Sequence, residues 1–133
     1  MATLIGPGPN QVSTNEMLGG MAFQDKDSVK TKGINRVYGV TDVTAATYTM
    51  LDTDTDIVVN YAGTCTLTLL AASLHKGREL WIKTITANLV NAATSQVVPL
   101  LGGAAGTAIL AATAGKWARL VSDGTNWRIM AAA

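Results

Sequence analysis

Three aspartates spaced by two, Asp52, Asp54 and Asp56, form the densest group of side chains that could do chemistry. Carboxylates at alternate positions resemble the opening of an EF-hand loop, whose oxygen ligands surround calcium. The rest of that loop is missing, because Ile57 stands where it needs glycine and Gly63 where it needs the bidentate glutamate. The sequence therefore favours an acidic turn whose side chains accept hydrogen bonds from nearby backbone amides. A weaker cation site of another kind stays open as the alternative.

The single histidine, His75, and the single cysteine, Cys65, offer little support for catalysis. A catalytic histidine would need an orienting carboxylate and a nucleophile, and no sequence pattern supplies them. One cysteine excludes an intrachain disulfide and a CxxC-type metal or redox site. We expect Cys65 to be a small apolar residue in a strand and His75 to lie on a surface loop, with a thiol dyad of the two as the alternative. The chain is therefore not expected to be an enzyme or to hold a cofactor or metal.

Trp81, Trp117 and Trp127 are the residues best suited to contact a ligand. Exposed tryptophans can stack on sugar rings, whereas buried ones would add bulk to a core otherwise made of small residues. Trp117 and Trp127 flank the Asp123-Gly124 pair and are expected to lie near one another across it. Core or interface packing is the favoured interpretation, and glycan binding by Trp117 and Trp127 is the alternative.

Composition and charge narrow the function classes. Of the 133 residues, 48% are hydrophobic but only 5% aromatic, and 14% are charged, well below the typical quarter. Such a bland surface is expected to be covered in part by other subunits. The net charge is +1, with Lys and Arg spread singly along the chain, so nucleic acid is not an expected ligand.

No segment of the sequence resembles a membrane or secretion signal. The N-terminus lacks the basic and apolar regions of a signal peptide, and no stretch reaches the ~18 uninterrupted apolar residues of a membrane span. Residues 100–114 come nearest, but glycines and threonines interrupt them, and they are expected to be a glycine-rich turn between two strands. We therefore expect no membrane partner, and we expect the protein to be made and kept in the cytoplasm until assembly.

The elements that must position these side chains are short strands. Alternation of Cys65, Leu67 and Leu69 with threonines gives one buried and one solvated face, and Leu80 and Ile82 alternate in the same way. The expected strands are 36–40, 47–51, 57–61, 65–69, 79–85, 89–90, 96–100, 116–121 and 126–130, with one helical turn in 71–75. The Asp-Gly pair between the last two strands is a strong hairpin signal. This spacing indicates an all-β fold, an antiparallel β-sandwich or a jelly-roll-like module.

Residues 1–40 differ from the rest of the chain. They hold two of the three prolines and show no sustained periodicity. Met17, Leu18, Met21 and Phe23 form a local apolar group, in a segment too short to build its own core. We therefore expect an extended N-terminal arm, 1–40, that docks through these anchors on a partner or on the rest of the chain. The β module would span 41–133.

Several short motifs follow one another in a familiar order. They are DTDIVVN at 54–60, LTL at 67–69, GRELWIK at 77–83 and SDGTNW at 122–127, with NQVST at 10–14, MLG at 17–19 and MAFQD at 21–25 in the arm. Together they resemble a β-rich module of bacteriophage tail-fibre and virion-surface proteins. Each motif is weakly specific, and their order carries the resemblance.

The resemblance implies a non-enzymatic and usually trimeric virion protein, with strands packed about a threefold axis, and it brings no catalytic residues. Long tail fibres have shafts or coiled coils before such modules, whereas only residues 1–40 precede this one and no heptad is visible. We therefore expect a homotrimeric capsid decoration (cement) or head-fibre protein on the virion surface, bound to the major capsid protein or to tail proteins. The alternative is a short tail-fibre or adaptor subunit that binds host surface glycan.

Overall fold

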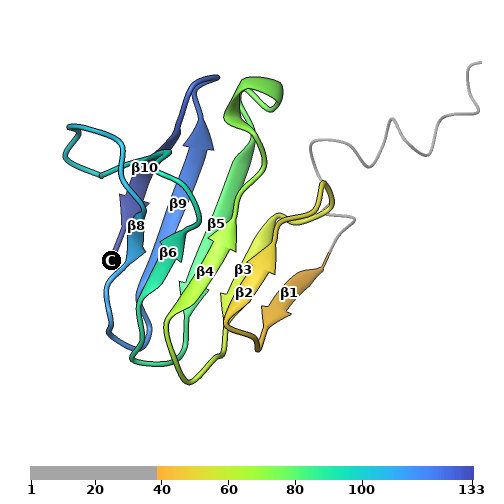
Figure 1. Cartoon of the computed structure of the whole chain (residues 1–133), viewed down its shortest axis with the longest axis vertical. Helices are drawn as coiled ribbons and strands as arrows, with labels where there is room; N and C mark the ends of the chain where they lie inside the picture. The colour runs from red at the N-terminus through yellow and green to blue at the C-terminus, as the bar shows by residue number, and fades with distance from the viewer. Residues whose placement is uncertain (1–38) are drawn as a thin grey trace, which may run out of the picture. The chain divides into compact units, whose positions relative to one another are not determined.

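The computed structural model describes residues 39–133, and these residues form an all-β fold (Figure 1). Its elements are β1 (Val40–Val43), β2 (Thr47–Thr49), β3 (Asp56–Val59), β4 (Cys65–Thr68), the 3-10 helix η1 (Ala72–Leu74), β5 (Glu79–Thr84), β6 (Val90–Ala92), β7 (Val97–Val98), β8 (Ala108–Leu110), β9 (Trp117–Ser122) and β10 (Trp127–Ala132). The expected all-β class is confirmed. The four proposed arm anchors, Met17, Leu18, Met21 and Phe23, lie outside the described residues.

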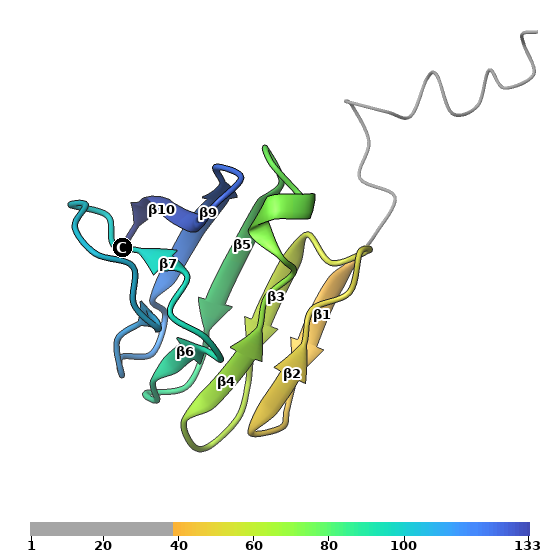
Figure 2. The same cartoon turned by 45° about the horizontal axis from the view of Figure 1, so that its top comes forward.

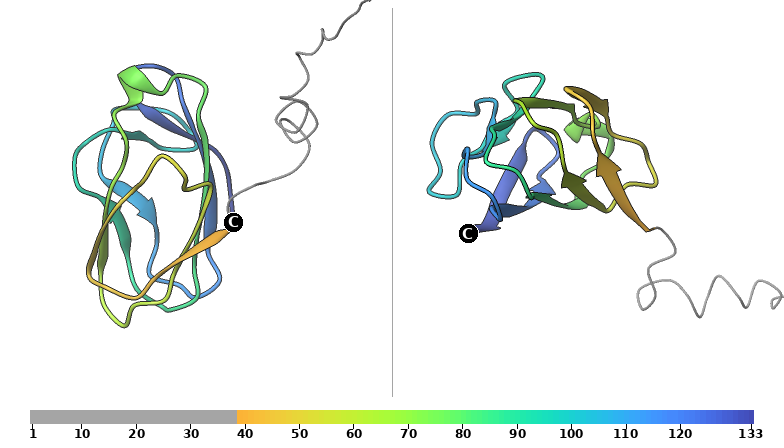
Figure 3. Two further views of the ribbon diagram at one scale, coloured as in Figure 1. Left: turned by 90° about the vertical axis from the view of Figure 1, so that its right-hand side faces the viewer. Right: turned by 90° about the horizontal axis from the view of Figure 1, so that it is seen from below.

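These strands form two sheets. One has six strands in the order β1-β3-β5-β9-β10-β7, and the other has four in the order β2-β4-β6-β8. Figures 2 and 3 show the two sheets as separate layers. Buried side chains from both sheets belong to one hydrophobic cluster, so the core lies between the layers.

The first six strands wind through the two sheets as stacked coils. β1, β3 and β5 pair in parallel in the six-stranded sheet. Their successors β2, β4 and β6 pair in parallel in the four-stranded sheet. The pairs β1–β2, β3–β4 and β5–β6 are therefore three coils. The second and third coils are in register, because Ile57 pairs with Ile82 and Cys65 with Val90, an offset of 25 residues in each case.

The expected antiparallel pairing is wrong for five of the eight strand pairs, which are parallel. Antiparallel pairs occur only where β9 joins β5 and β10, and where β8 joins β6. Alternation along a strand tells which face is buried, and that alternation is the same in parallel and antiparallel sheets. The pairing partners of the strands therefore could not be predicted from the alternation of buried and exposed residues.

Most strands lie where the sequence places them, with two differences. The first strand is Val40–Val43 and shares only Val40 with the expected strand 36–40, and the segment 100–114, expected as a turn, contains β8. Ile109 and Leu110 of β8 are buried, and β8 forms the edge of the four-stranded sheet beside β6. The expected helical turn in 71–75 is confirmed as η1.

Coil stacking places similar side chains over one another in the core. Ile57 lies beside Ile82 and Cys65 beside Val90, and all four are buried. Burial of each large aliphatic side chain contributes about 1.5–3 kcal/mol, which makes these stacks a main source of stability. Cys65 is the small apolar strand residue that the sequence predicts, and burial raises the pKa of its thiol.

The Asp-Gly hairpin between β9 and β10 is confirmed. Asp123 Oδ1 accepts the backbone N–H groups of Thr125 and Asn126, each at 2.8 Å, and Asp123 Oδ2 accepts from Arg128. The two amides and Arg128 lower the pKa of Asp123 to about 2. Gly124 has a φ of 94°, in the left-handed region that the turn requires.

Gly124→Ala is expected to lower the free energy of unfolding by about 1–3 kcal/mol, because alanine is strained at this φ. Its Cβ would also lie 3.2 Å from Lys76 Cδ. Urea denaturation followed by circular dichroism measures the change. Gly106→Ala is the matched control, since Gly106 has no positive φ and no atom within 4 Å of an added Cβ, so it should change stability by less than about 0.5 kcal/mol. Equal losses in both variants would contradict the strain argument.

Candidate functional site

Asp52, Asp54 and Asp56 lie in three different environments. Asp54 is only 3% exposed, and its carboxylate accepts hydrogen bonds from Thr41 Oγ1 at 2.5 Å, Tyr48 Oη at 2.8 Å and the Leu51 amide at 2.7 Å. The Asp52 side chain is 79% exposed, and Asp56 accepts from the Thr55 hydroxyl. Residues 39–133 contain no group of three or more His, Cys, Asp or Glu that could hold a metal ion. The acidic-turn interpretation therefore holds for Asp54, whose carboxylate accepts from one backbone amide and two hydroxyls.

Asp54 fastens its loop to the rest of the module. Burial alone would raise the pKa of its carboxyl, but the hydrogen bonds from Leu51, Thr41 and Tyr48, with the charge of Arg78, lower that pKa below its usual value of 3.8. Burial, followed by the bond to Asp54, raises the pKa of Tyr48. Arg78 Nη2 donates to the backbone carbonyl of Asp54 at 2.7 Å, which ties the loop to the start of β5. These hydrogen bonds to Asp54 hold the loop in place and indicate a structural role for this carboxylate.

His75 lies on the loop between η1 and β5, as expected. Its Nδ1 is 2.9 Å from the Ala71 carbonyl oxygen, and its Nε2 is 3.2 Å from Asp52 Oδ1. Cys65 lies in the core with none of its surface exposed. The structure therefore joins His75 to Asp52 and does not bring it to Cys65 as a dyad.

Trp127 is a core residue. None of its surface is exposed, and its Nε1–H donates to the Leu70 carbonyl at 2.8 Å. Glycan binding by Trp127 is therefore wrong, because neither ring face is open to a sugar. The expected proximity of Trp117 and Trp127 is also wrong. Trp127 pairs with Ser122 beside the hairpin turn, whereas Trp117 begins β9 at the far end of the same ladder and pairs with Lys83.

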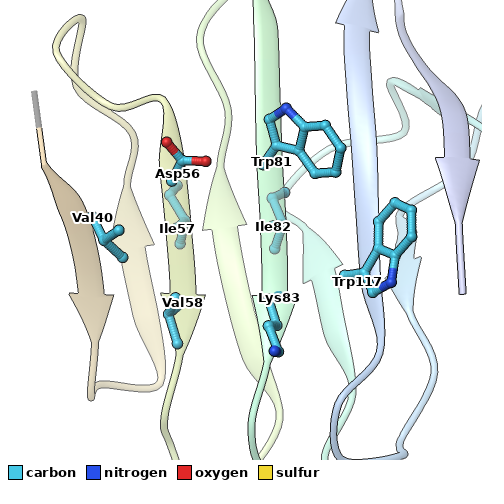
Figure 4. Close-up of a pocket in the computed structure, with 8 residues that line it drawn as sticks. All are labelled: Val40, Asp56, Ile57, Val58, Trp81, Ile82, Lys83 and Trp117. Atoms are coloured by element: carbon cyan, nitrogen blue, oxygen red, sulfur yellow. The ribbon is translucent and has the colours of Figure 1, made fainter. Parts of the chain in front are cut away.

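Trp117 instead contacts Trp81. The ring centroids are 5.5 Å apart, with the planes inclined by 31°, and both rings are half-buried (Figure 4). They lie on the face of the six-stranded sheet that points away from the core, because their strand neighbours Leu80, Ile82 and Ala118 are buried. The predicted site lacked Trp81, although the expected burial of Leu80 and Ile82 already implied that Trp81 faces outward.

A shallow groove of about 360 Å³ lies along this pair (Figure 4). The residues that line it, here called the Trp81–Trp117 groove, are Val40, Asp56, Ile57, Val58, Trp81, Ile82, Lys83 and Trp117. They come from β1, β3, β5 and β9, and register sets their neighbours: Val58 is paired with Lys83, and Lys83 with Trp117. Lys83 is exposed, so the groove combines an aromatic platform with charged groups of both signs.

A comparison of the chain with protein-family models and with curated proteins finds no match. Within residues 39–133, no helix has the length and apolar character needed to cross a membrane.

Proposed function

We propose that this chain is a non-enzymatic virion structural protein of a bacteriophage, a small homotrimeric capsid decoration (cement) or head-fibre protein. The order of its motifs supports this proposal, as does the low fraction of charged residues. The single structural observation that favours it is the exposure of apolar side chains, above all Leu74 of η1 and Leu101 of the loop between β7 and β8, which are 79% and 97% exposed. In the proposed assembly, neighbouring subunits cover these side chains.

In the proposed assembly, the two-layered β module packs as a sandwich around a threefold axis, through faces rich in Ala, Thr and Val. The arm of residues 1–40 reaches the major capsid protein or a tail protein, with Met17, Leu18, Met21 and Phe23 as anchors. Three arms on one trimer bind the particle more firmly than one arm can, because the second and third contacts are intramolecular. The protein would fold in the host cytoplasm and end on the virion surface.

Removal of residues 1–35 is expected to leave a folded trimer that no longer binds particles. Light scattering should give about three times the mass of one chain for both proteins, where the full chain has a mass of 13.8 kDa and the shortened chain a correspondingly smaller one. Co-sedimentation with particles that lack this protein then tests attachment, with the full chain as control. A stable monomer would contradict the trimer, and a shortened protein that still decorates particles would contradict the arm.

The second candidate is a short tail-fibre or adaptor subunit that binds host surface glycan. The outward-facing tryptophan pair favours it, because aromatic surface is costly to leave in water unless it has a partner. Separating heads from tails before immunodetection distinguishes the two candidates. Protein in the head fraction supports the decoration protein, and protein in the tail fraction supports the fibre or adaptor.

A further inference from the structure

We propose that the Trp81–Trp117 groove is a saccharide-binding site. The inference rests on the second candidate function and deepens it, because it adds Trp81 to Trp117 and places the two rings in one groove. Saccharide binding is measured on the purified protein, whereas attachment to the head or tail is measured on particles. The binding proposal can therefore be wrong even if the protein attaches to particles as proposed.

The hydrophobic core does not require the ring of Trp81 or that of Trp117. The inner faces of β5 and β9 are filled by Leu80, Ile82, Ala118 and Leu120, each at most 1% exposed. Trp81 and Trp117 stand on the opposite face, where small polar residues would be sufficient for folding. Two of the three tryptophans in the chain are therefore placed toward solvent, which indicates a surface role.

The geometry of the pair follows from the register of β5 and β9. Trp81 pairs with Arg119 and Trp117 with Lys83, so the two rings are diagonal neighbours on adjacent antiparallel strands. At a centroid separation of 5.5 Å and a tilt of 31°, they form one continuous platform with neighbouring ring faces. The negative face of an indole attracts the weakly positive C–H groups on one face of a pyranose ring.

The two tryptophan rings have polar neighbours. Lys83 offers an ammonium donor and Asp56 a carboxylate acceptor beside the rings. Sugar hydroxyls donate and accept at once, so they are complementary to side chains of both kinds. The volume of about 360 Å³ lies at the lower end of small-ligand sites, which fits one or two sugar units.

The test is binding of the full chain to a printed array of O-antigen, capsular and peptidoglycan-derived oligosaccharides. The strongest binder is then titrated while acrylamide quenching of tryptophan fluorescence is followed. Bound sugar should protect Trp81 and Trp117, with buried Trp127 as a constant background. Trp81→Ala and Trp117→Ala should each weaken binding by about tenfold. Trp81→Phe should weaken it less, because it keeps an aromatic face.

Leu89→Ala is the control, since Leu89 is a partly exposed apolar residue, 43% exposed, in the loop between β5 and β6 and does not line the groove. It should leave binding unchanged. If either alanine variant fails to fold, Lys83→Ala replaces it, because Lys83 is exposed and its loss should also weaken binding. The proposal is overturned if no saccharide binds the parent, or if binding survives in the variants. A change in molar mass in either tryptophan variant would identify the face as a contact between copies and would also overturn it.

Discussion

Trp127→Ala is expected to lower the free energy of unfolding by about 3–5 kcal/mol, the largest effect of any single change considered for this chain. Trp127 has no exposed surface and belongs to the core between the sheets, so alanine would leave a cavity. The change also removes the donor to the Leu70 carbonyl. Urea denaturation measures the loss.

Trp117→Ala is the control for the loss of an indole ring, and it should cost no more than about 1.5 kcal/mol because that ring is half-exposed. Trp127→Phe separates volume from hydrogen bonding. It retains much of the ring but removes the indole N–H, and we expect it to cost about 1–3 kcal/mol. Similar losses for Trp117→Ala and Trp127→Ala would show that Trp127 does not anchor the core.

Asp54→Ala is expected to lower the free energy of unfolding by about 2–4 kcal/mol, because three donors would lose their shared acceptor. Those donors are the hydroxyls of Thr41 and Tyr48 and the amide of Leu51. Asp52→Ala is the matched control in the same loop, and its exposed side chain should contribute less than about 1 kcal/mol. Equal losses of stability in Asp54→Ala and Asp52→Ala would contradict the structural role of the hydrogen bonds to Asp54.

The same carboxylate predicts a dependence of stability on pH. Because the pKa of Asp54 in the folded state lies below its usual value of 3.8, folding favours the ionised form. Its stabilising contribution is complete above that usual value and is lost as pH falls through the lower folded pKa. Asp54→Asn should therefore lose less stability than the parent between about pH 5 and pH 2.

Asp123 also has a lowered pKa, so the parent and the Asp54→Asn variant should both weaken in acid. The difference between their two curves isolates Asp54. Parallel curves would show that the Asp54 carboxylate has the same pKa in the folded and unfolded protein. Urea midpoints at matched ionic strength provide the measurement.

The sequence predicts the positions of most strands because alternation along each one marks its buried face. Leu67 and Leu80 are buried as that alternation requires. The partners of the strands could not be predicted, since the same alternation serves parallel and antiparallel ladders. β8 was missed because its Ile109 and Leu110 stand among glycines and alanines that resemble a turn.

The candidate site was predicted only in part for a related reason. Alternation places Trp81 outward, but only the register shows that Trp117 is its diagonal neighbour. The strand 126–130 was correctly located, yet which of its faces meets the core depends on the second sheet. Trp127 therefore could not be separated from Trp117 by sequence alone.

The offset of 25 residues between the second and third coils has a consequence for how such a chain can change in length. From the second coil to the third, the paired strands of both sheets are offset by the same 25 residues, so one coil is a unit that can be duplicated as a whole. Duplicating a coil would extend the stack by about 4.8 Å, the spacing of neighbouring strands, while β9 and β10 still close its end. Gene duplication could thus alter the reach of this module in fixed steps without redesigning its terminal strands.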